Sequence, residues 1–340
     1  MNKHRAVIGI LLVSFFAFLT CSLCSALGND SLGDLPKRAI ERSQITLPGS
    51  PPFHLVAKVF EATNRDNDNY DAEIDEDWSA PDKWRRTIKS PKFSETLITN
   101  GSQTSDAITG DYYPLWLHTL VDAIFDPGAP LQGVDLTKSR DNPMLGGQQT
   151  CRRFGYRVGI APVQNTIFAS YCFQDGLIQS IWRPGHGADY SNYKKFGAKQ
   201  VARKIQEEIE PGTILEADIV ALEEEPAPAD STFAIDHPAE PLRTVMVNEQ
   251  TLWGIAVDSP QMQWPTIHDG KPVGTLSIYV CVDRQGHVRE TYGLNSDNPY
   301  MTDAARKQLM NWTFKPALND GEAVQLEGIV TFAYQTQIVR

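Results

Sequence analysis

Apolar and polar residues alternate along many short stretches of this chain, which is the pattern of half-buried β-strands. From Phe53 to Val59 every second residue is apolar. The stretch 70–78 has an acidic outer face, made by Asp71, Glu73, Asp75 and Asp77. The stretch 83–89, which follows a turn, has a basic face made by Lys83, Arg85 and Lys89. The two stretches predict a hairpin in which cations face acids, and such pairs help to fix the register.

Further alternating runs predict a strand-rich first domain over residues 51–222. The expected strands are 93–99, 152–158, 166–173, 177–182, 200–209 and 214–222, and one helix interrupts them at 113–125. Its apolar residues recur at spacings of three and four. Many antiparallel strands with a helix laid across them predict a curved sheet or half-barrel with a covered concave face. The same side chains would line a packed core or a lipid-sized cavity, so both interpretations stay open.

The first 26 residues have the pattern of a secretory signal. Lys3, His4 and Arg5 precede an apolar stretch that ends in the small residues Cys24-Ser25-Ala26. The stretch is also about long enough to cross a bilayer, since roughly 20 residues suffice, so a retained inner-membrane anchor is the alternative. We expect cleavage and export, followed by a flexible segment over residues 27–50.

Charge limits the kinds of partner. The 340 residues carry a formal net charge of −11. A nucleic-acid backbone or an anionic lipid surface would therefore be repelled unless a local basic patch intervened. We expect no nucleic-acid partner. The length suggests two domains.

Three cysteines lie outside the signal: Cys151, Cys172 and Cys281. An odd number in an oxidising compartment predicts one disulfide and one free thiol. Cys151 and Cys172 lie in strand-like runs that a Pro- and Gly-containing stretch could fold back on each other, so we expect a disulfide between them. Three buried thiols are the alternative. Cys281 lies inside an apolar strand, where a lone cysteine is usually a small apolar residue.

An acidic, Pro-rich segment over residues 223–241 precedes a second domain, residues 242–340. We expect this segment to be an exposed, semi-rigid spacer. In the second domain an alternating strand begins at Gly274, a turn at 283–286 leads into another strand, and a helix follows that Asp297 or Asn298 can cap. The last strand covers 324–337. The order strand, strand, helix, strand predicts a small ββαβ domain, which makes the whole chain α+β.

The second domain resembles the C-terminal domain of TonB-family proteins over residues 264–337. The resemblance rests on Gly274, Gly286, Trp312, Phe314 and Pro316, with the helix around residues 304–305. It implies a cell-envelope protein that faces the periplasm and binds an outer-membrane receptor, or another envelope protein, by adding a strand at a sheet edge. The implied edge consists of Val330, Thr331, Phe332, Ala333, Tyr334 and Gln335. Alternatively, this edge completes the sheet or pairs with a second copy of the chain in a homodimer.

Residues 51–222 resemble lipoprotein-carrier folds of the LolA and LolB type, through Phe53-His54-Leu55 and the hairpin around residues 78–85. This resemblance implies a periplasmic carrier of a lipid or an acyl chain. An anchored TonB-type energy transducer is a third interpretation. A folded first domain in place of a long Pro-rich segment, together with a cleaved signal, argues against it.

The sequence contains no recognised catalytic, cofactor or metal motif. G-x-S-x-G, H-E-x-x-H, the P-loop and G-x-G-x-x-G are all missing. His186, in a loop-like setting, and Cys172 could imitate a Cys–His nucleophile, but a disulfide explains Cys172 better. We therefore expect no catalytic residues, no cofactor and no metal. The leading hypothesis is a non-enzymatic envelope adaptor, and the alternative is a lipid or lipoprotein carrier.

Overall fold

The computed structural model describes residues 34–129, 139–141, 149–210, 212–239 and 241–339. The expected signal over residues 1–26 lies outside these ranges. Within them, no helix is both long enough and apolar enough to cross a bilayer. The segment expected to be flexible contains helix α1 (Asp34–Ser43), in which Ala39 is fully buried. Apolar residues at helical spacing, Leu35 and Ala39, pack this helix against the core of the first domain.

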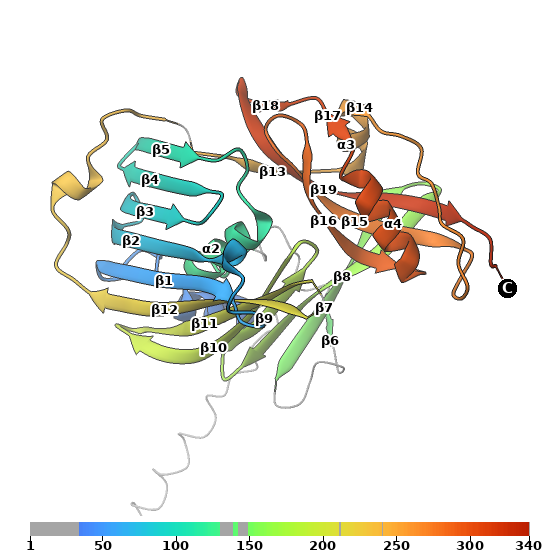
Figure 1. Cartoon of the computed structure of the whole chain (residues 1–340). Helices are drawn as coiled ribbons and strands as arrows, with labels where there is room; N and C mark the ends of the chain where they lie inside the picture. The colour runs from blue at the N-terminus through green and yellow to red at the C-terminus, as the bar shows by residue number, and fades with distance from the viewer. Residues whose placement is uncertain (1–33, 130–138, 142–148, 211, 240, 340) are drawn as a thin grey trace, which may run out of the picture.

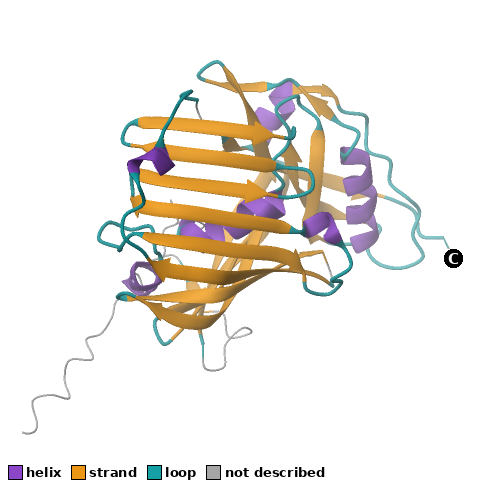
Figure 2. Cartoon of the chain, turned by 60° about the vertical axis from the view of Figure 1, so that its left-hand side comes forward, coloured by secondary structure: helices purple, strands orange, loops and turns teal. Residues whose placement is uncertain are grey.

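The first domain is one curved antiparallel sheet of 12 strands (Figures 1 and 2). The strands are β1 (Phe53–Glu61), β2 (Ala72–Ala80), β3 (Lys83–Lys89), β4 (Ser94–Asn100), β5 (Gln103–Thr109), β6 (Arg140–Asp141), β7 (Thr150–Ile160), β8 (Val163–Gln174), β9 (Leu177–Arg183), β10 (His186–Phe196), β11 (Lys199–Glu210) and β12 (Thr213–Glu224). The pairing of β1 with β12 joins two meanders, β1 to β5 and β12 to β6. The expected large antiparallel sheet is thus confirmed.

Helix α2 (Leu115–Phe125) lies in the hollow of this sheet (Figure 1). Nine of its eleven residues are buried. Apolar side chains of α2, such as Leu117 and Leu120, pack against the inward side chains of the strands. Two voids beneath the helix measure about 10 Å³ each. A void of that size holds one water at most, so the concave face is a packed core with α2 in place.

The inner face of the sheet also holds charged groups, at positions where the alternation otherwise places apolar side chains. Glu76 is fully buried in the row of Ile74 and Trp78. Arg86 Nε, on the next strand, donates to Glu76 Oε2 at 2.6 Å, and its guanidinium lies 3.7 Å from the centroid of the Phe125 ring. An isolated buried carboxylate would be very costly, so this pairing explains how Glu76 is tolerated.

Glu95 lies beside this pair and is 6% exposed. Burial, together with the nearby charge of Asp106, raises the pKa of Glu95 to about 7, although Arg86 and His118 oppose the shift. In the unfolded chain the pKa of a glutamate is near its ordinary value, about 4.3. Between pH 4.3 and pH 7, roughly, Glu95 is therefore mostly protonated in the folded protein and mostly ionised in the unfolded chain.

We predict that Glu95→Gln removes a pH-dependent loss of stability. Because the folded pKa exceeds the unfolded one, the free energy of unfolding of the parent protein falls as the pH rises from about 4.3 to 7, by on the order of 3 kcal/mol from this group. Urea unfolding at pH 4.5 and 8 measures the difference. Glu73→Gln, at an exposed position of β2, is the control. Equal pH dependence in both variants would contradict the assignment.

The acidic, Pro-rich segment follows the rim of the sheet. Its 3-10 helix η4 (Asp230–Phe233) buries Phe233, and Lys83 Nζ lies 2.5 Å from Asp230 Oδ1. Further on, Ala239 N donates to the carbonyl of Thr104 at 2.9 Å, which covers part of the edge of β5. The segment expected as an exposed spacer therefore packs on the first domain and shields an open sheet edge.

The second domain has the expected order strand, strand, helix, strand in β15 (Val273–Val282), β16 (Val288–Ser296), α4 (Pro299–Leu309) and β19 (Glu322–Gln335). Shorter elements are β13 (Thr244–Val247), α3 (Glu249–Ile255), β14 (Ala256–Asp258), β17 (Thr313–Phe314) and β18 (Ala317–Asn319). The main sheet has the order β13-β19-β15-β16, with β13 parallel to β19.

Both faces of this second sheet are covered. On one face Ile278 and Val280 pack with residues of α3 and α4. On the other face Tyr279 and Cys281 pack against Leu115 of α2. The expected disulfide between Cys151 and Cys172 is confirmed, and Cys281 is a buried free thiol.

Candidate functional site

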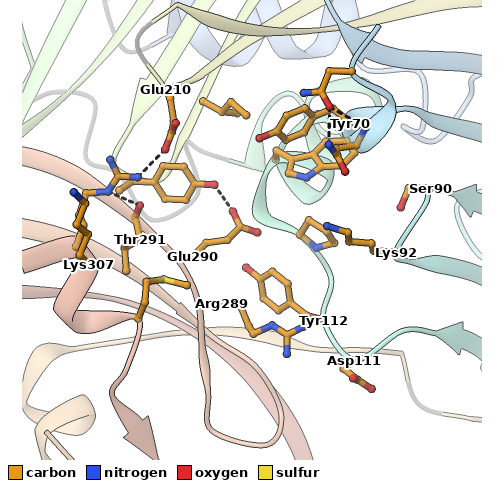
Figure 3. A pocket seen from close by; sticks show the side chains of 18 of the residues that line it. Tyr70, Ser90, Lys92, Asp111, Tyr112, Glu210, Arg289, Glu290, Thr291 and Lys307 are labelled. Atoms are coloured by element: carbon orange, nitrogen blue, oxygen red, sulfur yellow. Dashed lines mark hydrogen bonds and ion pairs between the residues drawn. The ribbon is translucent and has the colours of Figure 1, made fainter. Parts of the chain in front are cut away.

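A cleft of about 800 Å³ lies where the second domain meets the rim of the half-barrel (Figure 3). The first domain supplies the loop after β1, the β3–β4 turn, the start of α2 and the end of β11. The second domain supplies β16 and α4. The side chains that line the cleft include Tyr70, Lys92, Asp111, Tyr112, Trp116, Ile209, Glu210, Arg289, Glu290, Tyr292, Asp303, Arg306 and Lys307.

The floor of the cleft is apolar. The rings of Tyr70 and Trp116 meet edge to face, with centroids 5.6 Å apart. Trp116 belongs to the core of the half-barrel, and Tyr70 and Ile209 pack against that core. The floor is therefore an extension of the hydrophobic core that reaches solvent at the open end of the sheet.

Charged groups of both signs surround this floor. Arg306 Nη2 of α4 lies 2.8 Å from Glu210 Oε1 of β11, an ion pair that joins the two domains across the cleft (Figure 3). Lys92 and Lys307 make no ion pair with any residue that the structure describes. The exposed carboxylates Asp111 and Asp303 also line the cleft. The walls of the cleft thus present charges of both signs.

Glu290 lies between the cleft and the domain interface. It accepts hydrogen bonds from the N–H of Leu115 at 3.1 Å and from the hydroxyl of Tyr292 (Figure 3). Burial raises the pKa of Glu290, and these hydrogen bonds only partly oppose the rise. Glu207, buried nearby on β11, has its pKa raised strongly by burial and by the charge of Glu290. These two acids therefore carry less negative charge than exposed carboxylates would.

The second domain also fixes the start of α2. The cap residue Pro114 offers no side-chain hydrogen bond, so the first N–H groups of the helix need other acceptors. Leu115 N, the first N–H of the helix, donates to Glu290 Oε1 at 3.1 Å. Just before the cap, Tyr113 N donates to Gln325 Oε1 at 2.6 Å, and Gln325 Nε2 donates back to the carbonyl of Tyr113 at 3.3 Å. The carboxylate of Glu290 lies at the positive end of the helix dipole.

His118 makes another contact between α2 and the second domain. Its Nδ1 lies 3.8 Å from Glu327 Oε1. Burial lowers the pKa of His118, but the hydrogen bond to Glu327 and the charge of Asp122 outweigh it, so the pKa is raised overall. A protonated imidazole strengthens this contact with the second domain.

We predict that Gln325→Met destabilises the protein by about 2 kcal/mol, because it leaves the buried N–H and C=O of Tyr113 without their partner. Urea unfolding measures this loss, and hydrogen exchange should show faster exchange at the start of α2. Gln337→Met, at an exposed position beyond β19, is the matched control. An equal effect of both substitutions would contradict a specific role of Gln325.

The predicted partner-binding edge lies away from the cleft, on β19. On the β13 side, pairing of β19 covers Gln325 to Gly328, and the six predicted residues follow. Ala333 and Gln335 are exposed, whereas the side chains of Val330, Thr331, Phe332 and Tyr334 are buried. Thr331 N donates to Glu249 Oε1 at 2.9 Å. Strand addition at this edge stays a prediction.

The motif residues of the second domain have mainly structural positions. Gly286 has φ +92°, and a Cβ atom there would overlap the carbonyl oxygen of Phe314. Trp312 and Phe314 are buried in the core, and Pro316 is exposed. No cluster of His, Cys, Asp or Glu among the described residues could hold a metal ion.

The comparisons with known proteins add two distant structural neighbours. No protein-family model and no curated protein matches the chain. A LolA superfamily protein, NE2245 from Nitrosomonas europaea, is 8% identical, with a TM-score of 0.28, and the match covers 61% of this chain and 98% of that chain. An outer membrane lipoprotein-sorting protein domain from Vibrio parahaemolyticus is 8% identical, with a TM-score of 0.32, and the match covers 59% of this chain and 94% of that chain. Neither neighbour is a TonB-family protein, and TM-scores this low do not establish a shared function.

Proposed function

We propose that the protein is a periplasmic, non-enzymatic carrier that binds an amphipathic ligand, a lipid or a lipoprotein acyl group, in the cleft between its domains. The observation that carries this proposal is the apolar floor of Tyr70, Trp116 and Ile209 in a cleft of about 800 Å³. This volume lies within the range of small-molecule sites, roughly 300–1,000 Å³. The signal-like N-terminus supports export.

The division of the cleft into floor and walls suits an amphipathic ligand. An acyl chain on the floor would gain about 0.8 kcal/mol for each buried CH₂ group. The headgroup would face Lys92 and Lys307, or Asp111 and Asp303, on the walls. The interior beneath α2 is packed, so the chain would lie above the helix and not under it.

We predict that Ile209→Glu weakens binding of a fluorescent fatty-acid probe roughly tenfold or more, because it places a carboxylate where the acyl chain lies. Probe titration of the exported protein measures the affinity. Val220→Glu, at a 58% exposed position of β12, is the matched control. Native mass spectrometry of protein recovered from the envelope should also show a releasable lipid. No probe binding and no lipid, or equal binding by both variants, would overturn the carrier function.

As a second candidate function, we propose that β19 binds an envelope protein by strand addition. Pairing with β13 stops at Gly328, and the exposed Ala333 and Gln335 follow on the same side as the outward N–H of Thr331. Since outward N–H groups recur every second residue, Ala333 also points its N–H away from β15.

A photo-crosslinker at Gln335 tests this second candidate. We predict an adduct with an envelope protein that disappears with Ala333→Pro, because proline removes the outward N–H while sparing the pairing with β15. Electrophoresis of crosslinked envelope samples measures it. An adduct of twice the chain's own mass would assign the edge to a homodimer. No adduct, or one that Ala333→Pro leaves unchanged, would exclude strand addition.

A further inference from the structure

Basic residues are concentrated in one part of this acidic chain. Residues 150–183, which form β7, β8 and β9, contain four arginines and a single carboxylate, Asp175 in a turn. The whole chain has a net charge of −11. The three strands themselves contain no Asp or Glu. This region therefore has a charge opposite to that of the rest of the protein.

The strand register brings part of this charge to the outer face of the sheet. Arg153 and Arg157 are exposed and alternate with the buried Phe154. Arg140 of β6 pairs with Arg153 and is also exposed. Residues that are directly opposite on adjacent strands share a face. The three arginines thus form one basic group on the outside of the half-barrel.

Two large aromatic side chains lie on the same face. Phe168 pairs with Gly155 and is 46% exposed, and Trp182 pairs with Ser170 and is 53% exposed. The Arg153 guanidinium lies 4.5 Å from the centroid of the Phe168 ring. We name Arg140, Arg153, Arg157, Phe168 and Trp182 the outer patch.

Glycines let these rings lie against the strands. Indole atoms of Trp182 come within 2.9 Å of where a Cβ atom of Gly187 would be, and the Phe168 ring lies 3.4 Å from the corresponding point at Gly155. The rings therefore cover backbone on one side and present their other side to solvent. Asp189, on the next strand β10, is exposed and marks the acidic border of the outer patch.

We propose that the outer patch docks the protein on an anionic lipid surface. Tryptophan is favoured at the boundary between water and lipid because its ring is apolar and its N–H is polar. Arginine binds lipid phosphates through its planar, multiply donating guanidinium. The acidic remainder of the chain is repelled by such a surface, so the protein would dock with this face toward it. This role does not depend on ligand binding in the cleft.

Vesicle flotation of the exported protein tests the proposal. Wild type should float with phosphatidylcholine vesicles that contain phosphatidylglycerol, less so at high salt, and not with phosphatidylcholine alone. Arg153→Glu with Arg157→Glu should lower the partition coefficient roughly tenfold or more. Lys194→Glu with Lys195→Glu, an equal charge change at exposed positions of β10, should lower it much less. No binding by wild type, or equal loss in both double variants, would overturn the proposal.

A second measurement keeps the test independent of folding defects. Brominated lipids in the same vesicles should quench tryptophan fluorescence, and Trp182→Phe should remove most of that quenching while the protein still floats. Quenching that Trp182→Phe leaves unchanged would overturn the placement of the outer patch. Binding to soluble polyaspartate but not to vesicles would assign this face to an acidic protein and overturn the lipid proposal.

Discussion

The burial of α2 between two sheets is the constraint on which the rest of the structure depends. Its residues fill the hollow of the half-barrel, and Leu115 at its start also packs against Tyr279 and Cys281 of the second domain. Nine of the eleven residues of α2 are buried, so this helix must be covered on nearly all sides. The half-barrel covers one side of α2 and the second domain covers much of the other, so the cleft at its start exists only while both domains are in place.

Separating the second domain from the half-barrel would therefore lower the stability of both parts. Its central strand β15 is buried on both faces, and the inward hydroxyl of Tyr279 donates to Glu327 Oε2 at 2.5 Å. Separation would expose these groups and leave the start of α2 without the acceptors on Gln325 and Glu290. A buried network of hydrogen bonds fixes one relative orientation of the two domains, because any other orientation would leave buried polar groups without hydrogen-bond partners. The cleft is therefore pre-formed, which lowers the entropic cost of binding a ligand there.

The sequence predicted elements well where one periodic pattern decided them, and poorly where distant segments meet. The β2–β3 hairpin pairs Glu73 with Lys89 and Asp77 with Arg85, as the charge alternation indicates. The same alternation puts Glu76 in the inner row of Ile74 and Trp78. It did not identify Arg86 as the partner of Glu76, because only the folded register brings the two side chains together. The cleft was not predicted at all, because Lys92, Ile209 and Lys307 come from three remote segments with no shared spacing. The predicted helix carries Trp116 and the predicted strand 200–209 ends at Ile209, but neither pattern indicated that these floor residues meet.

Strand β19 carries the proposed partner-binding edge and also contacts α2 beside the cleft, yet the two proposed functions remain physically separable. Gln325 and Glu327 on its first half face α2, whereas Ala333 lies beyond the last residue that pairs with β13. At about 3.3 Å per residue, Glu327 and Ala333 are roughly 20 Å apart along the strand. A continuous strand that pairs with β15 from Leu326 to Gln335 has one arrangement, and the structure gives it no second one. Coupling between two sites requires an element with two states that both sites bias. A partner strand at Ala333 would therefore leave the cleft unchanged unless the whole domain interface moved.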